Sequence, residues 1–161
     1  MTTGAQRTAD AGLIVAFLNT YDTETDADSI ADQASWEAWS ARHDLPPAGA
    51  VATALTVRDG LRAVAAGAAP ATELTIPVAA GLVDGRPRTV PLDAAGAILL
   101  ASVRLADAGD WARIKLCAAA TCRWAFLDES RNRSRSWCSM EVCGNRAKAR
   151  SFRSRARGNI D

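Results

Sequence analysis

Four cysteines stand near the C-terminus as two equally spaced pairs. Four residues separate Cys117 from Cys122, and Cys138 and Cys143 repeat that spacing after fifteen intervening residues. Zn²⁺ prefers four tetrahedral donors, with thiolate sulfurs at about 2.3 Å, and two cysteine pairs can wrap one ion from two sides. The chain's single histidine, His43, lies far upstream. The spacing therefore predicts one four-cysteine site per chain that holds a structural zinc ion.

Three other uses of four cysteines fit less well. Four cysteines allow three disulfide pairings, but we expect a cytoplasmic protein, because the N-terminus lacks a basic stretch followed by an apolar run and no segment reaches the roughly 18 apolar residues of a membrane span. A CxxC redox motif is absent. An iron–sulfur cluster also uses four thiolates, but this sequence lacks the tight cysteine triplet of that class.

The sequence offers little support for an enzyme. Any Ser-His or Cys-His mechanism would depend on His43, which stands just before Leu45, Pro46 and Pro47, where a helix is expected to stop. A hydrogen-bond donor is favourable at a helix C-terminus, so a structural role is the better interpretation. No Walker loop and no GxGxxG motif occurs. We expect a protein without catalytic activity.

The net charge of +1 hides a strong asymmetry. Residues 1–110 contain seven arginines and no lysine against fourteen acidic residues, a net charge of −7. Residues 111–161 contain twelve basic residues against four acidic ones, a net charge of +8. An acidic body with a basic end indicates contact with nucleic acid.

The basic residues concentrate in a loop and in a helix. Gly144 permits a tight turn or a positive φ after the fourth cysteine, and residues 145–157 can then form a basic helix roughly 20 Å long at 1.5 Å per residue. One stripe of that helix is arginine, and Ala149, Phe152 and Ala156 form a neighbouring packing stripe. Guanidinium groups bind phosphate oxygens and guanine edges bidentately. The candidate nucleic-acid-binding residues are Arg131, Asn132, Arg133, Arg135, Arg146, Lys148, Arg150, Arg153 and Arg157.

The stretch from residue 117 to residue 157 resembles the CGNR zinc finger, a bacterial family named for the tetrapeptide at 143–146. The segments that carry this resemblance are Cys122–Phe126, Asp128–Asn132, Trp137–Met140, Cys143–Arg146 and Ala147–Arg150. Upstream, Phe17–Thr20 and the Leu61-Arg62 helix look like the ABATE domain that usually precedes this finger. The resemblance implies a stress-related transcription regulator.

The elements before the cysteines are mostly helical by pattern. Apolar periodicity predicts helices over about 10–20, after Asp32 or Ser35, over 51–66 and over 94–108, the last closed by Gly109. Leu74, Ile76 and Val78 alternate, and Asp84-Gly85 marks a short hairpin. The fold class is therefore mainly α with a short β-hairpin. A helical domain, 1–110, precedes a small finger, 111–161, that ends in a basic helix.

Function is expected to follow from these two parts. The leading hypothesis is a DNA-binding transcription regulator; an RNA-binding module and a protein-interaction module that docks on transcription machinery are the alternatives. The helical body is expected to sense a small-molecule effector or to form a homodimer, because regulators commonly match two-fold operators. The residues expected to line an effector pocket are Asn19, Thr20, Trp36, Trp39 and Arg62.

Overall fold

The computed structural model describes residues 3–157; beyond Arg150 in the last helix, the side chain of Arg153 alone is described. Within this part of the chain the helices are α1 (Gly4–Leu18), α2 (Gln33–Arg42), α3 (Val51–Ala65), α4 (Ala94–Asp107) and α5 (Asn145–Arg157). The antiparallel strand pairs are β1 (Tyr21–Asp22) with β2 (Ala27–Asp28), β3 (Val78–Val83) with β4 (Arg86–Pro91), and β5 (Ile114–Leu116) with β6 (Ala125–Leu127). The helices agree with the expected helical body, while two strand pairs beyond the expected hairpin make it less purely helical.

Side-chain caps fix where three helices begin. The Asp32 carboxylate accepts from the Ser35 amide at 2.8 Å, and the Ser35 hydroxyl accepts in turn from the Asp32 amide at 3.2 Å. Asp93 caps α4 through the Gly96 amide at 2.7 Å. Thr3 caps α1, with its hydroxyl 3.2 Å from the Gln6 amide. This cap explains why α1 starts six residues before the expected start, since capping satisfies amide groups that would otherwise lack a partner.

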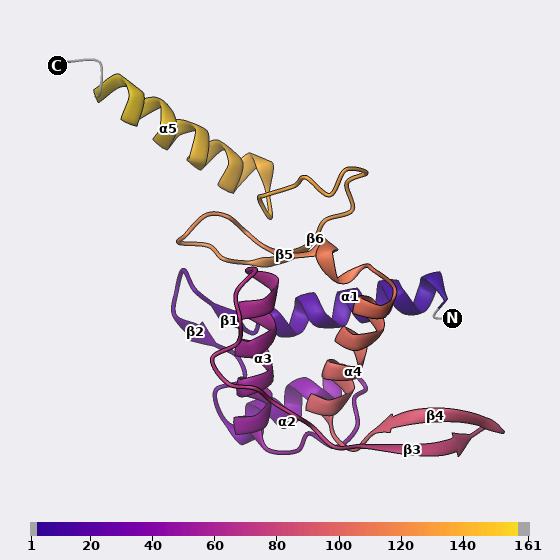
Figure 1. Ribbon diagram of the computed structural model, residues 1–161. Helices are drawn as coiled ribbons and strands as arrows, with labels where there is room; N and C mark the ends of the chain where they lie inside the picture. The colour runs from indigo at the N-terminus through magenta and orange to yellow at the C-terminus, as the bar shows by residue number, and fades with distance from the viewer. Residues whose placement is uncertain (1–2, 158–161) are drawn as a thin grey trace.

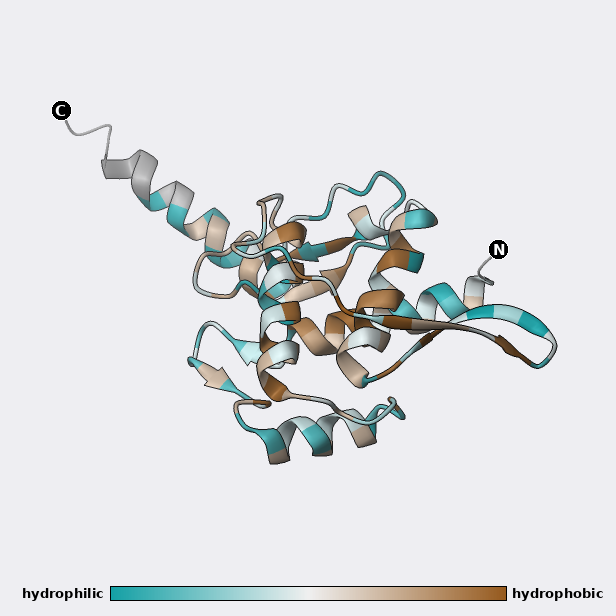
Figure 2. Cartoon of the chain, turned by 60° about the horizontal axis from the view of Figure 1, so that its bottom comes forward, coloured by the Kyte–Doolittle hydropathy of each residue, from teal (hydrophilic) through white to brown (hydrophobic). Residues whose placement is uncertain are grey.

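Helices α1, α3 and α4 surround one hydrophobic core (Figure 1). Phe17, Trp36 and Ile98 are fully buried, and the Trp36 and Trp39 rings stack at a centroid distance of 5.6 Å. The Trp36 indole donates to the Ala48 carbonyl at 2.9 Å. Figure 2 shows hydrophobic residues, in brown, along the central helices. None of the helices in residues 3–157 has the length and hydrophobicity needed to cross a bilayer.

The same core extends into the cysteine-bearing part of the chain. Ile114 on β5 and Ala125 on β6 are buried in the cluster formed by the helices, and Leu116 and Leu127 pack against it. The core therefore crosses the boundary that the sequence places between residues 110 and 111.

Hairpin β3–β4 departs from this packing. Its turn has φ of 51° at Asp84 and 71° at Gly85, as a type I′ turn requires. The alternation of Leu74, Ile76 and Val78 predicts a first strand that begins near Leu74, and this start is wrong. β3 begins at Val78, opposite the end of β4 at Pro91. Within the described residues, no strand pairs with those before Pro77. Figure 1 shows the hairpin projecting from the base of the helices.

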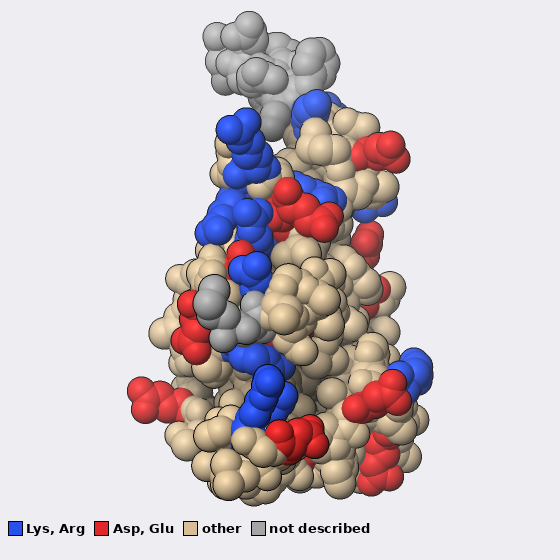
Figure 3. Space-filling view, turned by 90° about the vertical axis from the view of Figure 1, so that its right-hand side faces the viewer, with Lys and Arg blue, Asp and Glu red and all other residues tan. Residues whose placement is uncertain are grey.

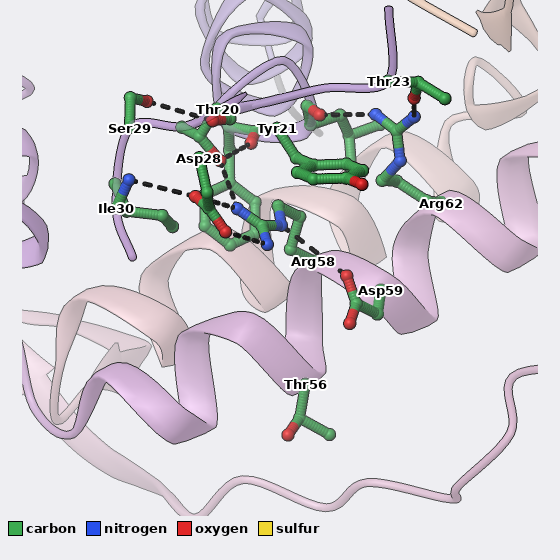
Figure 4. Close-up of polar contacts among 12 residues, drawn as sticks. Thr20, Tyr21, Thr23, Asp28, Ser29, Ile30, Thr56, Arg58, Asp59 and Arg62 are labelled. Carbon is green, nitrogen blue, oxygen red and sulfur yellow. Dashed lines mark hydrogen bonds and ion pairs between the residues drawn. The ribbon is translucent and has the colours of Figure 1, made fainter. Parts of the chain in front are cut away.

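A buried arginine fastens the short β1–β2 pair to α3 (Figure 4). Arg58 is 4% exposed and contacts both carboxylate oxygens of Asp28 at 2.7 Å and the Thr20 hydroxyl at 3.0 Å. On its other side, its Nε lies 3.6 Å from the exposed carboxylate of Asp59. The Tyr21 ring covers the guanidinium at 5.5 Å. These contacts place the α1–α2 connection against α3.

We expect Asp28→Asn to lower the free energy of unfolding by about 3–5 kcal/mol, because the substitution leaves the Arg58 charge buried without its partner. The control is Asp59→Asn, which removes a carboxylate that also faces Arg58 but is exposed; its effect should stay within about 0.5 kcal/mol. Urea unfolding measures both, and equal losses in the two variants would contradict the prediction.

The Asp28 effect should also depend on pH. Hydrogen bonds from Arg58 lower the pKa of Asp28 below its ordinary value. A lowered pKa stabilises the folded state above the unfolded value, about 3.9, and that contribution is lost as the pH falls through the folded-state pKa. The difference between wild type and Asp28→Asn should therefore shrink in acid.

Candidate metal centre and nucleic-acid interface

The four cysteine sulfurs converge on one point. All four Sγ atoms lie within 4.8 Å of one another, and Sγ of Cys138 lies 3.7 Å from those of Cys122 and Cys143. A tetrahedron with Zn–S bonds of about 2.3 Å places its sulfurs about 3.8 Å apart, whereas a disulfide needs about 2.05 Å. The four thiols are free. Their spacing matches a single structural zinc site, as the sequence predicts.

Two turns deliver the cysteine pairs. Cys117 follows β5, where its amide donates to the Trp124 carbonyl at 2.8 Å, and the Cys122 amide closes a turn onto Ala119 at 2.9 Å. Cys143 lies in a π-helical turn, Met140–Gly144, that leads directly into α5. The path of the chain around the sulfurs therefore sets where the basic helix starts.

Burial favours the protonated form of two thiols of this site. It raises the pKa of Cys138 and Cys143 above the ordinary thiol value, whereas at Cys117 burial is outweighed by hydrogen bonds, which lower the pKa of that thiol. Zinc binds thiolates, so binding must release protons, and the affinity for zinc is expected to fall as the pH falls.

Gly144 lies close beneath the half-exposed Met140 side chain. A positive φ occurs at four other glycines of the described chain, and Gly144 is not among them; of the two alternatives, a tight turn or a positive φ, the structure has the tight turn. A Cβ at this position would lie 2.7 Å from the Met140 sulfur and 3.4 Å from Trp137. Glycine allows the π-helical turn to close beneath Met140 beside the fourth cysteine.

The residues around this cysteine cluster match a known family. Residues 113–156 match the CGNR zinc finger family. The resemblance seen in the sequence is thus confirmed for this part of the chain, here called the CGNR finger. The match does not include residues 1–112, and nothing in the comparisons supports an ABATE domain there. No curated protein matches the chain.

Two side chains of the helical body hold the CGNR finger. Asn19, at the end of α1, donates to the Ala125 carbonyl at 2.9 Å and accepts from the Ala125 amide at 2.7 Å. Arg62 on α3 donates to the Leu18 carbonyl at 2.6 Å and to the Arg123 carbonyl at 3.1 Å. The bonds to Ala125 and Arg123 span 106 and 61 positions of sequence and join α1, α3 and the first cysteine turn.

A buried carboxylate organises the loop between the cysteine pairs. Asp128 is fully buried and accepts from Lys115 at 2.6 Å, from the Ser130 hydroxyl at 2.5 Å and from the Arg135 amide at 3.0 Å. Hydrogen bonds from Lys115 and Ser130 lower the pKa of Asp128 far below its ordinary range. Sequence reasoning missed this pair; Lys115 alternates with apolar residues on β5, but no local pattern names Asp128 as its partner.

The loop residues chosen from the sequence occupy different settings. Arg131 and Asn132 are exposed. Arg133 donates to the Gly109 carbonyl at 3.2 Å and approaches Asp110 at 4.0 Å. Arg135 donates to the Trp137 and Cys138 carbonyls and covers the Phe126 ring at 5.0 Å, so its guanidinium supports the second cysteine turn.

The helix residues are more accessible. Lys148, Arg150 and Arg153 are exposed and form no ion pair with the described residues, whereas Arg146 lies 3.3 Å from the exposed carboxylate of Glu24. Ala149 is exposed, so its expected packing role is wrong: α5 leaves the body instead of lying on it. The side chains of Phe152, Ala156 and Arg157 lie outside the described residues.

The cavities described within residues 3–157 are not lined by the five residues expected to form an effector pocket. Trp36 and Trp39 belong to the core, and Thr20 is buried against Arg58. Asn19 and Arg62 hold the CGNR finger. Two described cavities, of about 370 and 450 Å³, are lined by other residues, among them Arg7 and Arg113 in the first and Asp10, His43 and Arg104 in the second.

Zinc should stabilise the whole chain and not the CGNR finger alone. We expect Cys138→Ser to reduce bound zinc from one ion per chain to none and to lower the thermal midpoint of the helical body as well, because Ile114 and Ala125 belong to its core. Zinc binding is worth about 10–16 kcal/mol in comparable fingers. Elemental analysis and circular dichroism measure both effects, with chelation and zinc return on the wild type as a reversible control. Full folding of a zinc-free protein would refute the prediction.

Asn19 should couple the two parts of the chain. Asn19→Ala leaves the Ala125 amide and carbonyl without partners, and we expect it to lower the free energy of unfolding by about 1–3 kcal/mol. Asn132→Ala is the control, because Asn132 is exposed and forms no hydrogen bond with the described residues. Urea unfolding with zinc present tests both; an unchanged Asn19 variant would show that the coupling lies elsewhere.

Proposed function

We propose that this protein binds double-stranded DNA as a transcription regulator and that α5 is its main contact. The observation that carries the proposal is the setting of α5: it starts at the fourth cysteine and projects away from the body (Figure 1), with Lys148, Arg150 and Arg153 exposed. A basic helix whose residues Lys148, Arg150 and Arg153 form no ion pair with the described residues can enter a groove or follow a row of phosphates. The zinc ion fixes the start of this helix relative to the body.

A second basic region supports the same contact. Arg7 and Arg113 lie 3.4 and 3.5 Å from the single carboxylate of Asp110, and Arg133 lies 4.0 Å from it, so positive charge exceeds negative charge in this cluster. Figure 3 shows Lys and Arg atoms at several heights along one side of the molecule, with Asp and Glu atoms among them. The excess of positive charge at the Asp110 cluster can contact a phosphate backbone beyond the reach of α5.

The contacts separate binding residues from supporting ones. We assign DNA contact to Arg131, Asn132, Arg146, Lys148, Arg150 and Arg153, with Arg133 contributing through the Asp110 cluster; the side chain of Arg157, the remaining candidate of α5, lies outside the described residues. Arg135 is a supporting residue, because its Nε and one terminal nitrogen donate to carbonyls of the CGNR finger and its guanidinium covers the Phe126 ring. No catalytic step is part of the proposal, and the protein is proposed to act in the cytoplasm.

Duplex DNA is favoured over the two alternatives by the composition of this surface. Sequence-specific RNA recognition usually stacks unpaired bases on exposed aromatic rings. Among the aromatic residues of the CGNR finger whose side chains are described, Phe126 is buried and Trp137 is half-buried, and Trp124, 39% exposed, is the most accessible. A protein partner for α5 would need an acidic surface, and binding would then persist after nuclease treatment.

Duplex binding should be strongly salt-dependent. If four to six groups neutralise phosphates, log affinity should fall with log salt at a slope of roughly −4 to −5, at about −0.9 per contact. The double variant Arg150→Ala with Arg153→Ala should reduce the magnitude of that slope by about two and weaken binding, as measured by fluorescence anisotropy with zinc-loaded protein.

The matched control removes the same charge elsewhere. Arg86→Ala with Arg88→Ala takes two exposed arginines from the β3–β4 hairpin and should leave the slope unchanged. Unchanged affinity for both duplex DNA and RNA in the α5 variant would reject the assignment. A larger loss for single-stranded RNA than for duplex DNA would move it to the RNA-binding alternative.

A further inference from the structure

Hairpin β3–β4 extends away from the core that stabilises the rest of the body. Leu82 is 78% exposed, and Val78 and Val83 are 43% and 38% exposed. Figure 2 shows apolar residues carried outward along this hairpin. An isolated two-stranded hairpin is only marginally stable in water, and three or more strands are normally needed for independent stability. The exposed apolar residues of this hairpin are therefore typical of a strand pair that is stabilised by pairing with a further strand.

The strand register sorts the hairpin into two unlike faces. Residues directly opposite in an antiparallel pair lie on the same face, and alternate residues lie on opposite faces. One face carries both arginines, Arg86 and Arg88. The other face has no charge; it consists of the cross-strand pairs Val78–Pro91, Ala80–Thr89 and Leu82–Pro87.

The outer edges of the two strands also differ. In a hairpin closed by a two-residue turn, the pair next to the turn is hydrogen-bonded and the pairs alternate from there. Val83–Arg86 is that first pair, so the amides of residues 78, 80 and 82 on β3, and of residues 87, 89 and 91 on β4, face outward. Proline occupies positions 87 and 91 and has no amide hydrogen. The edge of β4 is therefore blocked at two of its three donors, while the edge of β3 is open.

We propose that β3 is a dimerisation strand that pairs antiparallel with β3 of a second copy of this chain. A two-fold axis at Ala80 places Val78 of each copy opposite Leu82 of the other and satisfies all three outward amides of both strands. The result is a four-stranded sheet in which the uncharged faces of two hairpins become continuous.

A second copy fits this edge because of its charge and symmetry. β3 contains no charged residue, so pairing with itself brings no like charges together, whereas pairing β4 with β4 would bring four arginines together. The apolar residues at positions 78 and 82 are symmetric about Ala80, as an isologous contact requires. The proposal does not depend on DNA binding, since none of these residues lies in the CGNR finger.

The test compares two proline substitutions at directly opposed positions. The zinc-loaded wild type should have the mass of two chains by light scattering at micromolar concentration. Ala80→Pro removes one outward amide from each copy and should weaken the dimer at least about tenfold. Thr89→Pro removes the corresponding amide from the edge that is already blocked and should leave the dimer intact. Circular dichroism and zinc content confirm that both variants fold.

A charge swap tests the register. Val78→Lys with Leu82→Lys should give monomers, whereas Val78→Glu with Leu82→Lys should restore the dimer, because each new pair across the axis then has opposite charges. A monomeric wild type would overturn the proposal, as would a dimer that survives Ala80→Pro and the double lysine variant. A folded double lysine variant whose dimer is not restored by the charge swap would overturn the Ala80 register. All of these outcomes are independent of whether the protein binds DNA.

Discussion

The convergence of four sulfurs is the constraint on which the C-terminal third of the structure depends. Among the described residues, the buried cluster around the sulfurs consists of Cys117, Ala119 and Cys143, and the Asp128 network and the cysteines take the place of a larger core. The cysteines also fix direction: Cys117 ends a strand anchored in the body's core, and Cys143 lies in the turn that opens α5. Zinc thus connects a packed element to an unpacked helix.

The sequence predicts the metal ligands and most elements of the fold, but it does not predict which side chains join the helical body to the CGNR finger. The cysteine spacing, the helices and the Asp84-Gly85 turn were readable, because each depends on a local pattern with its own physical cause. The bonds of Asn19 and Arg62 to the CGNR finger were not readable, since their partners are backbone groups distant in sequence. The sequence assigned the same two residues to a ligand pocket, because polar groups beside tryptophans are typical of one, and the structure shows them bonded to the CGNR finger.

The arginines show why composition alone overestimates the number of residues that can bind nucleic acid. Arg58 is buried against Asp28, and Arg135 supports the second cysteine turn, although both are counted in the charge of their segments. Lys148, Arg150 and Arg153 have no such contacts with the described residues. Basic side chains without such contacts can bind a phosphate without first breaking an existing interaction. Fewer basic groups are therefore available to nucleic acid than the net charge of +8 for residues 111–161 suggests.

The charge asymmetry also restricts how nucleic acid can approach. The body's net charge of −7 repels a phosphate backbone, and this repulsion weakens beyond a Debye length of about 8 Å at physiological salt. A helix that projects from the body carries its charges beyond much of that field, whereas one packed against the body would be neutralised by it. Arg146, at the start of α5, shows the difference, since it already pairs with Glu24 of the acidic β1–β2 connection. The projection of α5 is therefore an electrostatic requirement of the proposed function, and the zinc site at its base is what maintains it.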